Sequence, residues 1–393
     1  MGCLMAKLDK LIQELCPDGV EYKVLEEVLR YEQPSKYIVS NTDYNDEFEI
    51  PVLTAGQSFI LGYTNEAEGI YEASKNAPVI IFDDFTTANK WVDFRFKVKS
   101  SAMKLLTSKD FNKYNIRYLY HVIQTIRYTP VDHSRQWIGT YSKFTIPVPP
   151  IEVQEEIVRI LDNFTELTAE LTAELAARKK QYAYYEFKTI FENNYKFVKL
   201  GEICTVNQGL QIPISKRHKT PAQNRYLYIT VQFLKNREDE QYYIENPDKN
   251  VICSKDDILV TRTGSTGIII TGQEGCFHNN FFKVNCNHLV NKKYMLCLLR
   301  SQHMYNKMLA VASGGTVPDL PHKKFYNIEV PLPPLEEQQR IVSILDRFDA
   351  LCNDITVGLP AEIEARKKQY EYYRDKLLTF KEKVASWTTA HII

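Results

Sequence analysis

No part of this chain is apolar for long enough to cross a membrane, since no run among its 393 residues approaches the roughly 20 apolar residues of a membrane helix. The first residues, MGCLMAKLDK, also lack the extended apolar core of a secretory signal. The eight cysteines form no C-x-x-C pair, the spacing typical of redox motifs and of many structural zinc sites. These absences predict a soluble protein with free thiols in the reducing cytoplasm.

Motifs of a catalytic centre are also missing. The chain has no G-x-x-x-x-G-K-[ST] phosphate loop, no G-x-G-x-x-G that opens a helix, and no Asp/Asn-Pro-Pro-Tyr-type loop for methylating an amine. Two C-x-H pairs, beginning at Cys276 and Cys286, are interpreted as core cysteines of neighbouring strands, with a zinc site as the alternative. The acidic pair Asp83-Asp84 is interpreted as a turn or surface feature. We therefore expect no catalytic residue, no metal and no cofactor in this chain.

The net charge is zero, which by itself argues against a nucleic-acid-binding protein. The charges are, however, unevenly distributed. Residues 19–84 carry 4 basic and 13 acidic side chains, residues 85–146 carry 11 basic and 3 acidic, and residues 196–330 carry 18 basic and 11 acidic. Two basic regions predict two separate footprints for a polyanion, although local variation without a partner stays an alternative.

The most informative feature is an internal repeat. ARKKQYAYY begins at Ala177 and ARKKQYEYY at Ala365, with eight of nine positions identical. PPIEVQEEIVRILDNF, from Pro149, returns as PPLEEQQRIVSILDRF, from Pro333, with ten of sixteen positions identical. A short β-branched run precedes each Pro-Pro pair, so each repeat predicts a strand, a break and then a helix with glutamates near its start.

Apolar residues recur in both helical segments at steps of three and four, which predicts that one helix packs against another. The first segment contains the tandem TAELTAEL, from Thr168 to Leu175, and nothing in it interrupts a helix. We therefore predict one continuous helix of about 40 residues. In the second segment, TVGLP, from Thr356 to Pro360, predicts that the helix stops and restarts, with Pro360 near a new first turn.

The repeats divide the chain into alternating globular and helical segments. Both globular segments are rich in β-branched and aromatic residues and end in a helix-like stretch. The predicted fold class is mixed α/β (α+β), with two globular domains separated by two long antiparallel helices in a pseudo-twofold repeat. The predicted boundaries are an N-terminal segment 1–18, globular domains 19–148 and 196–332, helices 149–195 and 333–384, and a tail 385–393.

Four polar loops in the basic regions contain side chains suited to contacts with DNA. They are FTTANKW from Phe85, HSRQWIGTYSKF from His133, TRTGSTG from Thr261 and ASGGTVPDL from Ala312. Arg and Gln make bidentate contacts with base edges, whereas Lys and Thr suit phosphate oxygens. The candidate DNA-binding residues are Thr86, Thr87, Lys90, Arg135, Gln136, Lys143, Gln208, Lys216, Arg217, Arg262, Thr263, Ser265, Thr266 and Thr316.

As a set, these features resemble the specificity subunit of type I restriction–modification enzymes. The resemblance rests on the two PPxExQxxIxxILDxF segments, the two ARKKQYxYY phrases, the loops SRQWIGTYSKF and GGTVPDL, and the alternation of globular domain and helix. It covers nearly the whole chain. It implies that each globular domain reads one half of a bipartite, asymmetric site in double-stranded DNA, and that the helices fix the gap between the halves.

The resemblance also implies partners. The helices are expected to dock two methyltransferase subunits, and restriction–translocase subunits join through the assembled complex. S-adenosylmethionine, ATP and Mg belong to those partners, which fits the missing catalytic motifs. The candidate docking residues are Gln154, Ile157, Gln338, Ile341, Tyr182 and Tyr370. Two alternatives stay open: a duplicated coiled-coil adaptor, which salt-dependent DNA binding would disfavour, and a free-standing nuclease or methyltransferase, which turnover by the isolated chain would favour.

Overall fold

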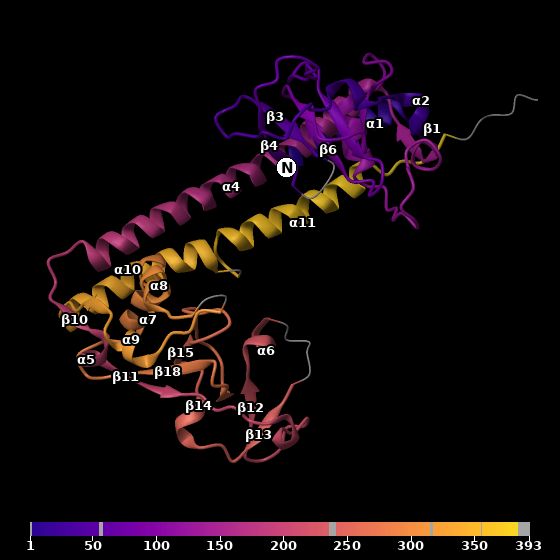
Figure 1. The fold of residues 1–393 in the computed structure, drawn as a ribbon. Helices are drawn as coiled ribbons and strands as arrows, with labels where there is room; N and C mark the ends of the chain where they lie inside the picture. The colour runs from indigo at the N-terminus through magenta and orange to yellow at the C-terminus, as the bar shows by residue number, and fades with distance from the viewer. Residues whose placement is uncertain (1, 55–57, 236–240, 315–316, 355, 384–393) are drawn as a thin grey trace, which may run out of the picture. The chain divides into compact units, whose positions relative to one another are not determined.

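The computed structural model describes residues 2–54, 58–235, 241–314, 317–354 and 356–383. The chain divides into two compact units (Figure 1). Unit 1 comprises Met1–Glu170 and Ile363–Ile393, and unit 2 comprises Leu171–Glu362. Each unit therefore contains one globular part and a stretch of each long helical segment. The predicted tail 385–393 lies outside the described residues.

The globular part of unit 1 contains two sheets and a two-stranded ribbon. The first sheet has the strand order β2-β8-β5-β6, the second has the order β4-β3-β7, and the ribbon pairs β1 with β9. The helix α1 occupies the N-terminal segment, to which the sequence analysis assigned no structure. The elements are α1 (Gly2–Leu15), β1 (Glu21–Val24), α2 (Leu25–Val28), β2 (Leu29–Glu32), the 3-10 helix η1 (Pro34–Tyr37), β3 (Ile50–Leu53), β4 (Ile60–Thr64), β5 (Val79–Asp83), β6 (Asn89–Val92), β7 (Lys97–Val98), β8 (Met103–Ser108), α3 (Ile116–Ile123), η2 (Tyr141–Lys143) and β9 (Thr145–Val148).

The central strand β5 is buried along its whole length because both faces of its sheet are covered. Ile80 and Phe82 belong to a core cluster that also contains side chains of α3 and of the following long helix. Val79 and Ile81 point to the opposite face and join a separate cluster with the β3 and β7 strands. The alternation of side chains along a strand thus gives the domain two cores, one on each side of the sheet.

Unit 2 is built in the same way. Its first sheet has the order β11-β18-β15-β16, its second the order β13-β12-β17-β14, and its ribbon pairs β10 with β19. The elements are β10 (Phe197–Lys199), α5 (Leu200–Ile203), β11 (Cys204–Gln208), η3 (Ile214–Lys216), β12 (Arg225–Ile229), α6 (Val231–Lys235), β13 (Tyr243–Glu245), η4 (Lys249–Val251), β14 (Ile252–Cys253), β15 (Ile258–Thr261), β16 (Ile269–Ile270), β17 (Gly275–Phe277), β18 (Phe281–Cys286), α7 (Lys292–Arg300), α8 (Gln302–Val311), α9 (His322–Tyr326) and β19 (Glu329–Pro331).

The two units share one chain path, which confirms the predicted internal repeat. In both, a short strand and one turn of helix precede a four-stranded antiparallel sheet whose strands follow in the same spatial order. The helix-like stretches predicted at the end of each globular segment are α3 and α7, and the strands predicted before each Pro-Pro pair are β9 and β19. Each unit therefore presents the same framework with different loops.

The first long helix, α4 (Ile151–Phe191), is continuous over 41 residues, as predicted. The second helical segment is split into α10 (Leu335–Asn353) and α11 (Leu359–Leu377), which confirms the predicted stop and restart. Gly358 is needed at this break, since a Cβ there would lie 2.6 Å from the carbonyl oxygen of Ala350. Asp354 closes the turn, because its carboxylate accepts a hydrogen bond of 2.7 Å from the backbone N–H of Thr356.

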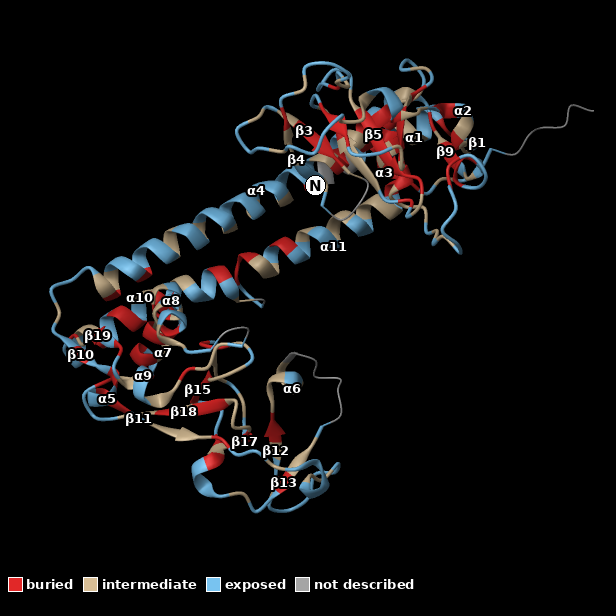
Figure 2. Ribbon diagram, in the orientation of Figure 1, coloured by how far each residue is buried: buried red, intermediate tan, exposed pale blue. Residues whose placement is uncertain are grey.

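Within each unit the helical stretches pack through the repeated phrase. In unit 1 the ring of Tyr373 stacks on Phe164 with centroids 5.3 Å apart. In unit 2 the ring of Tyr185 stacks on Phe348 at 5.9 Å. Within each unit the stretch of α4 and the stretch of the second helical segment run antiparallel, and the middle of α4 is mostly exposed (Figure 2). Among the described residues no helix combines the length and apolar character needed to span a membrane.

Candidate nucleic-acid interface

Two of the predicted loops of unit 1 lie together at the end of strand β5. The backbone N–H groups of Phe85 and Thr86 donate hydrogen bonds of 2.9 and 3.2 Å to the carboxylate of Asp83, which tightens the turn after the strand. Thr87 follows with a φ of 61°, a left-handed conformation. The ring of Phe85 stacks on His133 at 4.8 Å, so this turn and the loop that contains Arg135 form one surface.

A buried ion pair anchors this loop to the sheet. The Asp84 carboxylate accepts a hydrogen bond of 2.9 Å from the backbone N–H of Trp137. Its other oxygen lies 3.1 Å from the Nζ atom of Lys104, and the two side chains are 1% and 0% exposed. Asp84 lies in the turn after β5, so the interpretation of Asp83-Asp84 as a turn feature holds for it, but its carboxylate is buried in unit 1 and not at the surface.

The predicted DNA-binding residues of unit 1 separate into exposed and buried side chains. Thr86, Arg135 and Lys143 are exposed, and Lys90 is half-buried. Gln136 is only 2% exposed, and its amide accepts a hydrogen bond of 2.7 Å from the hydroxyl of Tyr128. Thr87 is also buried. The prediction of direct DNA contact does not fit Gln136 and Thr87, since their side chains face the protein interior and hold the loop.

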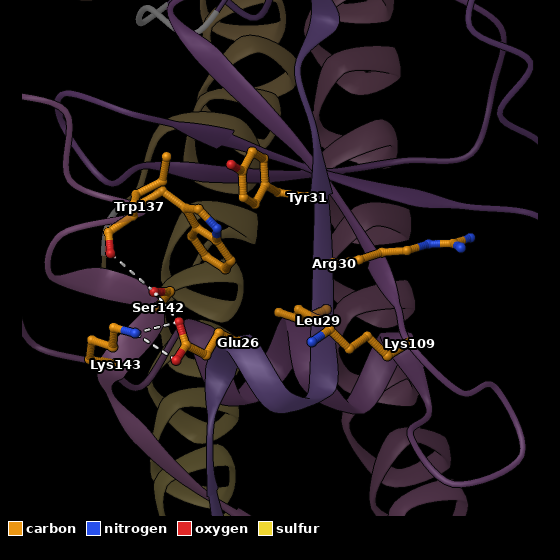
Figure 3. A pocket seen from close by; sticks show the side chains of 9 residues that line it. Glu26, Leu29, Arg30, Tyr31, Lys109, Trp137, Ser142 and Lys143 are labelled. Atoms are coloured by element: carbon orange, nitrogen blue, oxygen red, sulfur yellow. Dashed lines mark hydrogen bonds and ion pairs between the residues drawn. The ribbon is translucent and has the colours of Figure 1, made fainter.

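A cationic pocket of about 320 Å³ opens beside the same loop (Figure 3). Arg30 and Lys109 line it from the sheet, and Lys143 lines it from the loop. Lys143 lies 2.6 Å from Glu26, and this hydrogen-bonded pair lowers the pKa of the Glu26 carboxyl below its usual range. Arg30 and Lys109 were not among the residues predicted to bind DNA. Arg30 lies within β2 and Lys109 directly follows β8, so only the pairing of these two strands brings their charges beside the loop.

In unit 2 the predicted residues gather around Arg262, at the end of strand β15. Its guanidinium makes two hydrogen bonds with Asp319, at 2.8 and 3.1 Å, and a weaker one of 3.4 Å with the amide oxygen of Gln208. The hydroxyl of Thr266, which is 4% exposed, donates a hydrogen bond of 2.6 Å to the carbonyl oxygen of Pro318. Arg262 and Thr266 thus fasten the loop before α9 to the sheet.

The remaining predicted residues of unit 2 lie at its polar surface. The hydroxyl of Thr263 bonds to Asn280 at 3.0 Å, Ser265 is half-buried, and Lys216 is exposed. The guanidinium of Arg217 lies 5.0 Å from the centroid of the Tyr228 ring, a cation–π distance. Thr316 lies outside the described residues.

The two units fix their loops at equivalent positions with opposite charges. Strand pairing places Phe82 opposite Lys104 and Val260 opposite Phe282, so Asp84 and Arg262 each follow the matched residue by two positions. The backbone carbonyl of Asp84 accepts a bond from Gln136, and that of Arg262 accepts one from Leu320, 184 residues after Gln136. One strand-end position therefore carries an anion in unit 1 and a cation in unit 2.

Breaking the pair in unit 2 should loosen its loop. We expect Arg262→Ala and Asp319→Ala each to weaken DNA binding about tenfold, because a charge-assisted hydrogen bond contributes about 1.5–3 kcal/mol. The double variant should be little worse than either single variant, since both remove one interaction. Titration with DNA duplexes measures this coupling. Fully additive losses would show that the two side chains act separately.

The predicted docking residues are mostly interior. Gln154, Ile157, Gln338 and Ile341 are 0% exposed, so these side chains have no surface with which to touch a partner. Tyr182 and Tyr370 are half-buried, and the Tyr370 hydroxyl lies 3.0 Å from a ring nitrogen of His121. The burial of these four side chains therefore argues against their direct contact with a partner. Ile157 and Ile341 belong to the core clusters of their units.

No group of three or more potential metal ligands occurs within the described part of the chain. Cys276 is buried, and β17, which contains it, pairs in parallel with β12 and antiparallel with β14. The geometry of the site thus offers cations, hydroxyls and amides on two similar frameworks.

Known proteins share this organisation. A family model described as the type I restriction modification DNA specificity domain matches residues 17–178 and 192–365. The specificity subunit of the type I restriction enzyme EcoR124I/EcoR124II of Escherichia coli is 41% identical over 413 residues, which cover 96% of this chain and 97% of that protein.

Solved structures show the same fold. The S subunit of a type I restriction–modification system from M. genitalium aligns with a TM-score of 0.54 at 14% identity, covering 92% of this chain and 96% of that one. A chain solved in work on the assembly and conformational transition of the type I restriction–modification system gives a TM-score of 0.55 at 17% identity, covering 93% and 98%. The duplicated family match and the close full-length relative show that this chain belongs to the DNA specificity subunits of type I restriction–modification systems.

Proposed function

We propose that each globular domain, 19–148 and 196–332, reads one half of an asymmetric, bipartite site in double-stranded DNA. The observation that carries this proposal is the combination of one shared framework with different strand-end chemistry. Both units repeat the strand order of their first sheet, yet the buried Asp84 holds the loop of unit 1 at the position where Arg262 holds the loop of unit 2. The shared framework can contact the DNA backbone in the same way in both half-sites, because phosphates are alike in every sequence. The differing loops can contact different bases.

The exposed cations support contacts with phosphates. Arg135 and Lys143 of unit 1 and Lys216 of unit 2 are exposed on or near the candidate loops. Phosphate contacts release counterions, so binding through such residues weakens as salt rises. A coiled-coil adaptor without DNA binding would not show this dependence.

Reversing one exposed charge should reduce both affinity and salt dependence. For Arg135→Glu we expect weaker DNA binding and a log–log slope of affinity against salt that is smaller by about 1, because one phosphate contact is lost. Fluorescence anisotropy at several salt concentrations measures both quantities. The matched control is Lys10→Glu on α1, whose side chain is 74% exposed and outside the loops. Equal slopes for both variants would argue against a phosphate contact of Arg135.

We further propose that the helices 149–195 and 333–384 dock two methyltransferase subunits and set the distance between the half-sites. The restriction–translocase subunits join through this assembly. S-adenosylmethionine, ATP and Mg are then bound by the partners. The support is the repeat itself, since two like helical phrases suit two like partners.

Comparing adenine methylation across the genome with and without this gene tests the proposed function. We expect one bipartite motif to lose its methylation when the gene is deleted. Unchanged methylation, together with no salt-dependent DNA binding by the purified chain, would favour the adaptor.

A further inference from the structure

Each unit has an open pocket at the Pro-Pro turn that leads into its long helix. The two pockets have the same volume, about 540 Å³. The helix entry forms one wall of each, Val148–Ile151 in unit 1 and Leu332–Leu335 in unit 2. These two segments lie 184 residues apart, which is the spacing of the internal repeat at this point. The pockets are therefore two copies of one feature.

The other walls repeat as well. Asn112–Tyr114, in the loop before α3, line the first pocket, and His288–Leu289, in the loop before α7, line the second. Strand β1 contributes Glu21 to the first, and the residue before β10, Lys196, takes the matching place in the second. The same segments of the framework thus enclose both spaces, although most of the lining side chains differ.

A buried glutamine builds the pocket of unit 1. The Gln154 amide donates hydrogen bonds of 2.9 Å to the carbonyl oxygen of Lys113 and 2.7 Å to that of Pro149. Its oxygen accepts one of 2.9 Å from the backbone N–H of Asn115. The side chain is 0% exposed. Gln154 therefore ties the loop wall of the pocket to its Pro-Pro wall, and a buried amide keeps such bonds because an unsatisfied one is costly.

Gln338 makes the matching bonds in unit 2. Its amide donates hydrogen bonds of 3.1 Å to the carbonyl oxygen of Leu289 and 2.8 Å to that of Pro333. Its oxygen accepts one of 2.7 Å from the backbone N–H of Asn291. The glutamine that is identical in both Pro-Pro segments thus has one structural task, which is to hold the two walls of a pocket together.

The chemistry of the pockets indicates what they bind. Leu335 and Leu289 are 53% and 43% exposed in the pocket of unit 2, and Leu15 is 43% exposed in the pocket of unit 1. The Glu21 carboxylate of the unit 1 pocket is paired with Lys23 at 3.1 Å. Lys196 lies at the rim of the pocket in unit 2, and Lys383 lies at the rim of the pocket in unit 1; both amines are exposed. Such a site suits a segment with an apolar side chain beside a carboxylate.

We propose that the two pockets are the anchor points of the two methyltransferase subunits, each receiving the same apolar and acidic segment of that partner. The inference rests on the function proposed above and names the surface that performs its docking step. The occupant is one partner chain present twice, because the pockets are repeated whereas the loops that face the DNA are not. A ligand that acts at only one half-site would require a pocket in only one unit.

Acidic substitutions at the helix entries test this proposal. Ile151→Asp and Leu335→Asp place a carboxylate in the pocket that repels the acidic segment and removes its apolar contact. Both positions are the first residue of their helix. An aspartate there interacts favourably with the helix dipole, so we expect the fold to be retained. Native mass spectrometry of the co-expressed complex should show two methyltransferase subunits with the parent chain, one with either single variant, and none with the double variant.

Matched controls separate the pockets from the rest of the surface. Leu61→Asp on β4 and Leu309→Asp on α8 alter leucines that are 42% and 36% exposed outside the pockets, and these variants should keep both partners. DNA binding by the isolated double variant should be retained. A double variant that still carries two methyltransferases overturns the anchor proposal alone. A parent chain that recruits none overturns the proposed docking function as well.

Discussion

One additional Thr-Ala-Glu-Leu unit after Leu175 should lengthen the gap between the two half-sites by about one to two base pairs and leave their bases unchanged. The tandem lies in the continuous helix α4, and the boundary between the units falls inside it, between Glu170 and Leu171. Four helical residues add about 6 Å, and a base pair rises about 3.4 Å. The inserted residues replace no core contact, since the tandem contains no buried side chain.

Rotation also favours this result. Four residues exceed one helical turn by about 40°, and one base pair turns the duplex by about 35°. Mapping methylated adenines across a genome measures the gap directly. The matched control is Thr172→Ala, which changes the tandem without changing its length and should leave the gap as it was. An unchanged gap after the insertion, or new bases in either half-site, would contradict the assignment of α4 as the spacer.

The substitution Lys104→Met should lower the free energy of unfolding of unit 1 by about 3–5 kcal/mol. It leaves the Asp84 carboxylate buried without the cation that lies 3.1 Å away, and an unpaired buried charge costs that much. The loop held by Asp84 should loosen at the same time. Hydrogen exchange of β5 and β8 reports the local stability of unit 1 separately from that of unit 2.

A second variant separates charge from packing. Asp84→Asn combined with Lys104→Met removes both charges and keeps an oxygen that accepts the hydrogen bond of the Trp137 backbone. We expect this double variant to recover most of the lost stability, because replacing a buried ion pair by neutral groups is often nearly neutral. A double variant as unstable as Lys104→Met would show that the side-chain volume of Lys104 dominates.

The repeat explains why so much of the fold could be predicted. Two copies of a Pro-Pro helix with regular apolar spacing determine the element types, and the differing length around Gly358 reveals the break between α10 and α11. Local signals of this kind act through residues close in sequence. The helix α1 was missed, because a short amphipathic segment near a chain end resembles an unstructured one until its partner surface is known.

The site was predicted less well because burial depends on contacts distant in sequence. Gln136 and Gln154 have the polarity of contact residues, yet each is buried and bonded inside unit 1. The sequence does contain a trace of the Asp84 site. Lys104 interrupts an apolar strand, and a lysine in a central strand requires a buried acid nearby. Recognising that requirement does not reveal which acid, because Asp84 reaches it only through the pairing of β5 with β8.

The stacking of Tyr373 on Phe164 and of Tyr185 on Phe348 has a consequence for folding fidelity. The two phrases are nearly identical, so aromatic packing alone would let either phrase dock on either phenylalanine, in the same molecule or in a neighbouring one. Discrimination must come from positions at which the copies differ. Glu186 stands where the second copy has Arg374, and burial raises the pKa of the Glu186 carboxyl to about 7. The carboxyl of Glu186 beside one aromatic contact and the guanidinium of Arg374 beside the other would let each phrase pack stably on only one of the two phenylalanines.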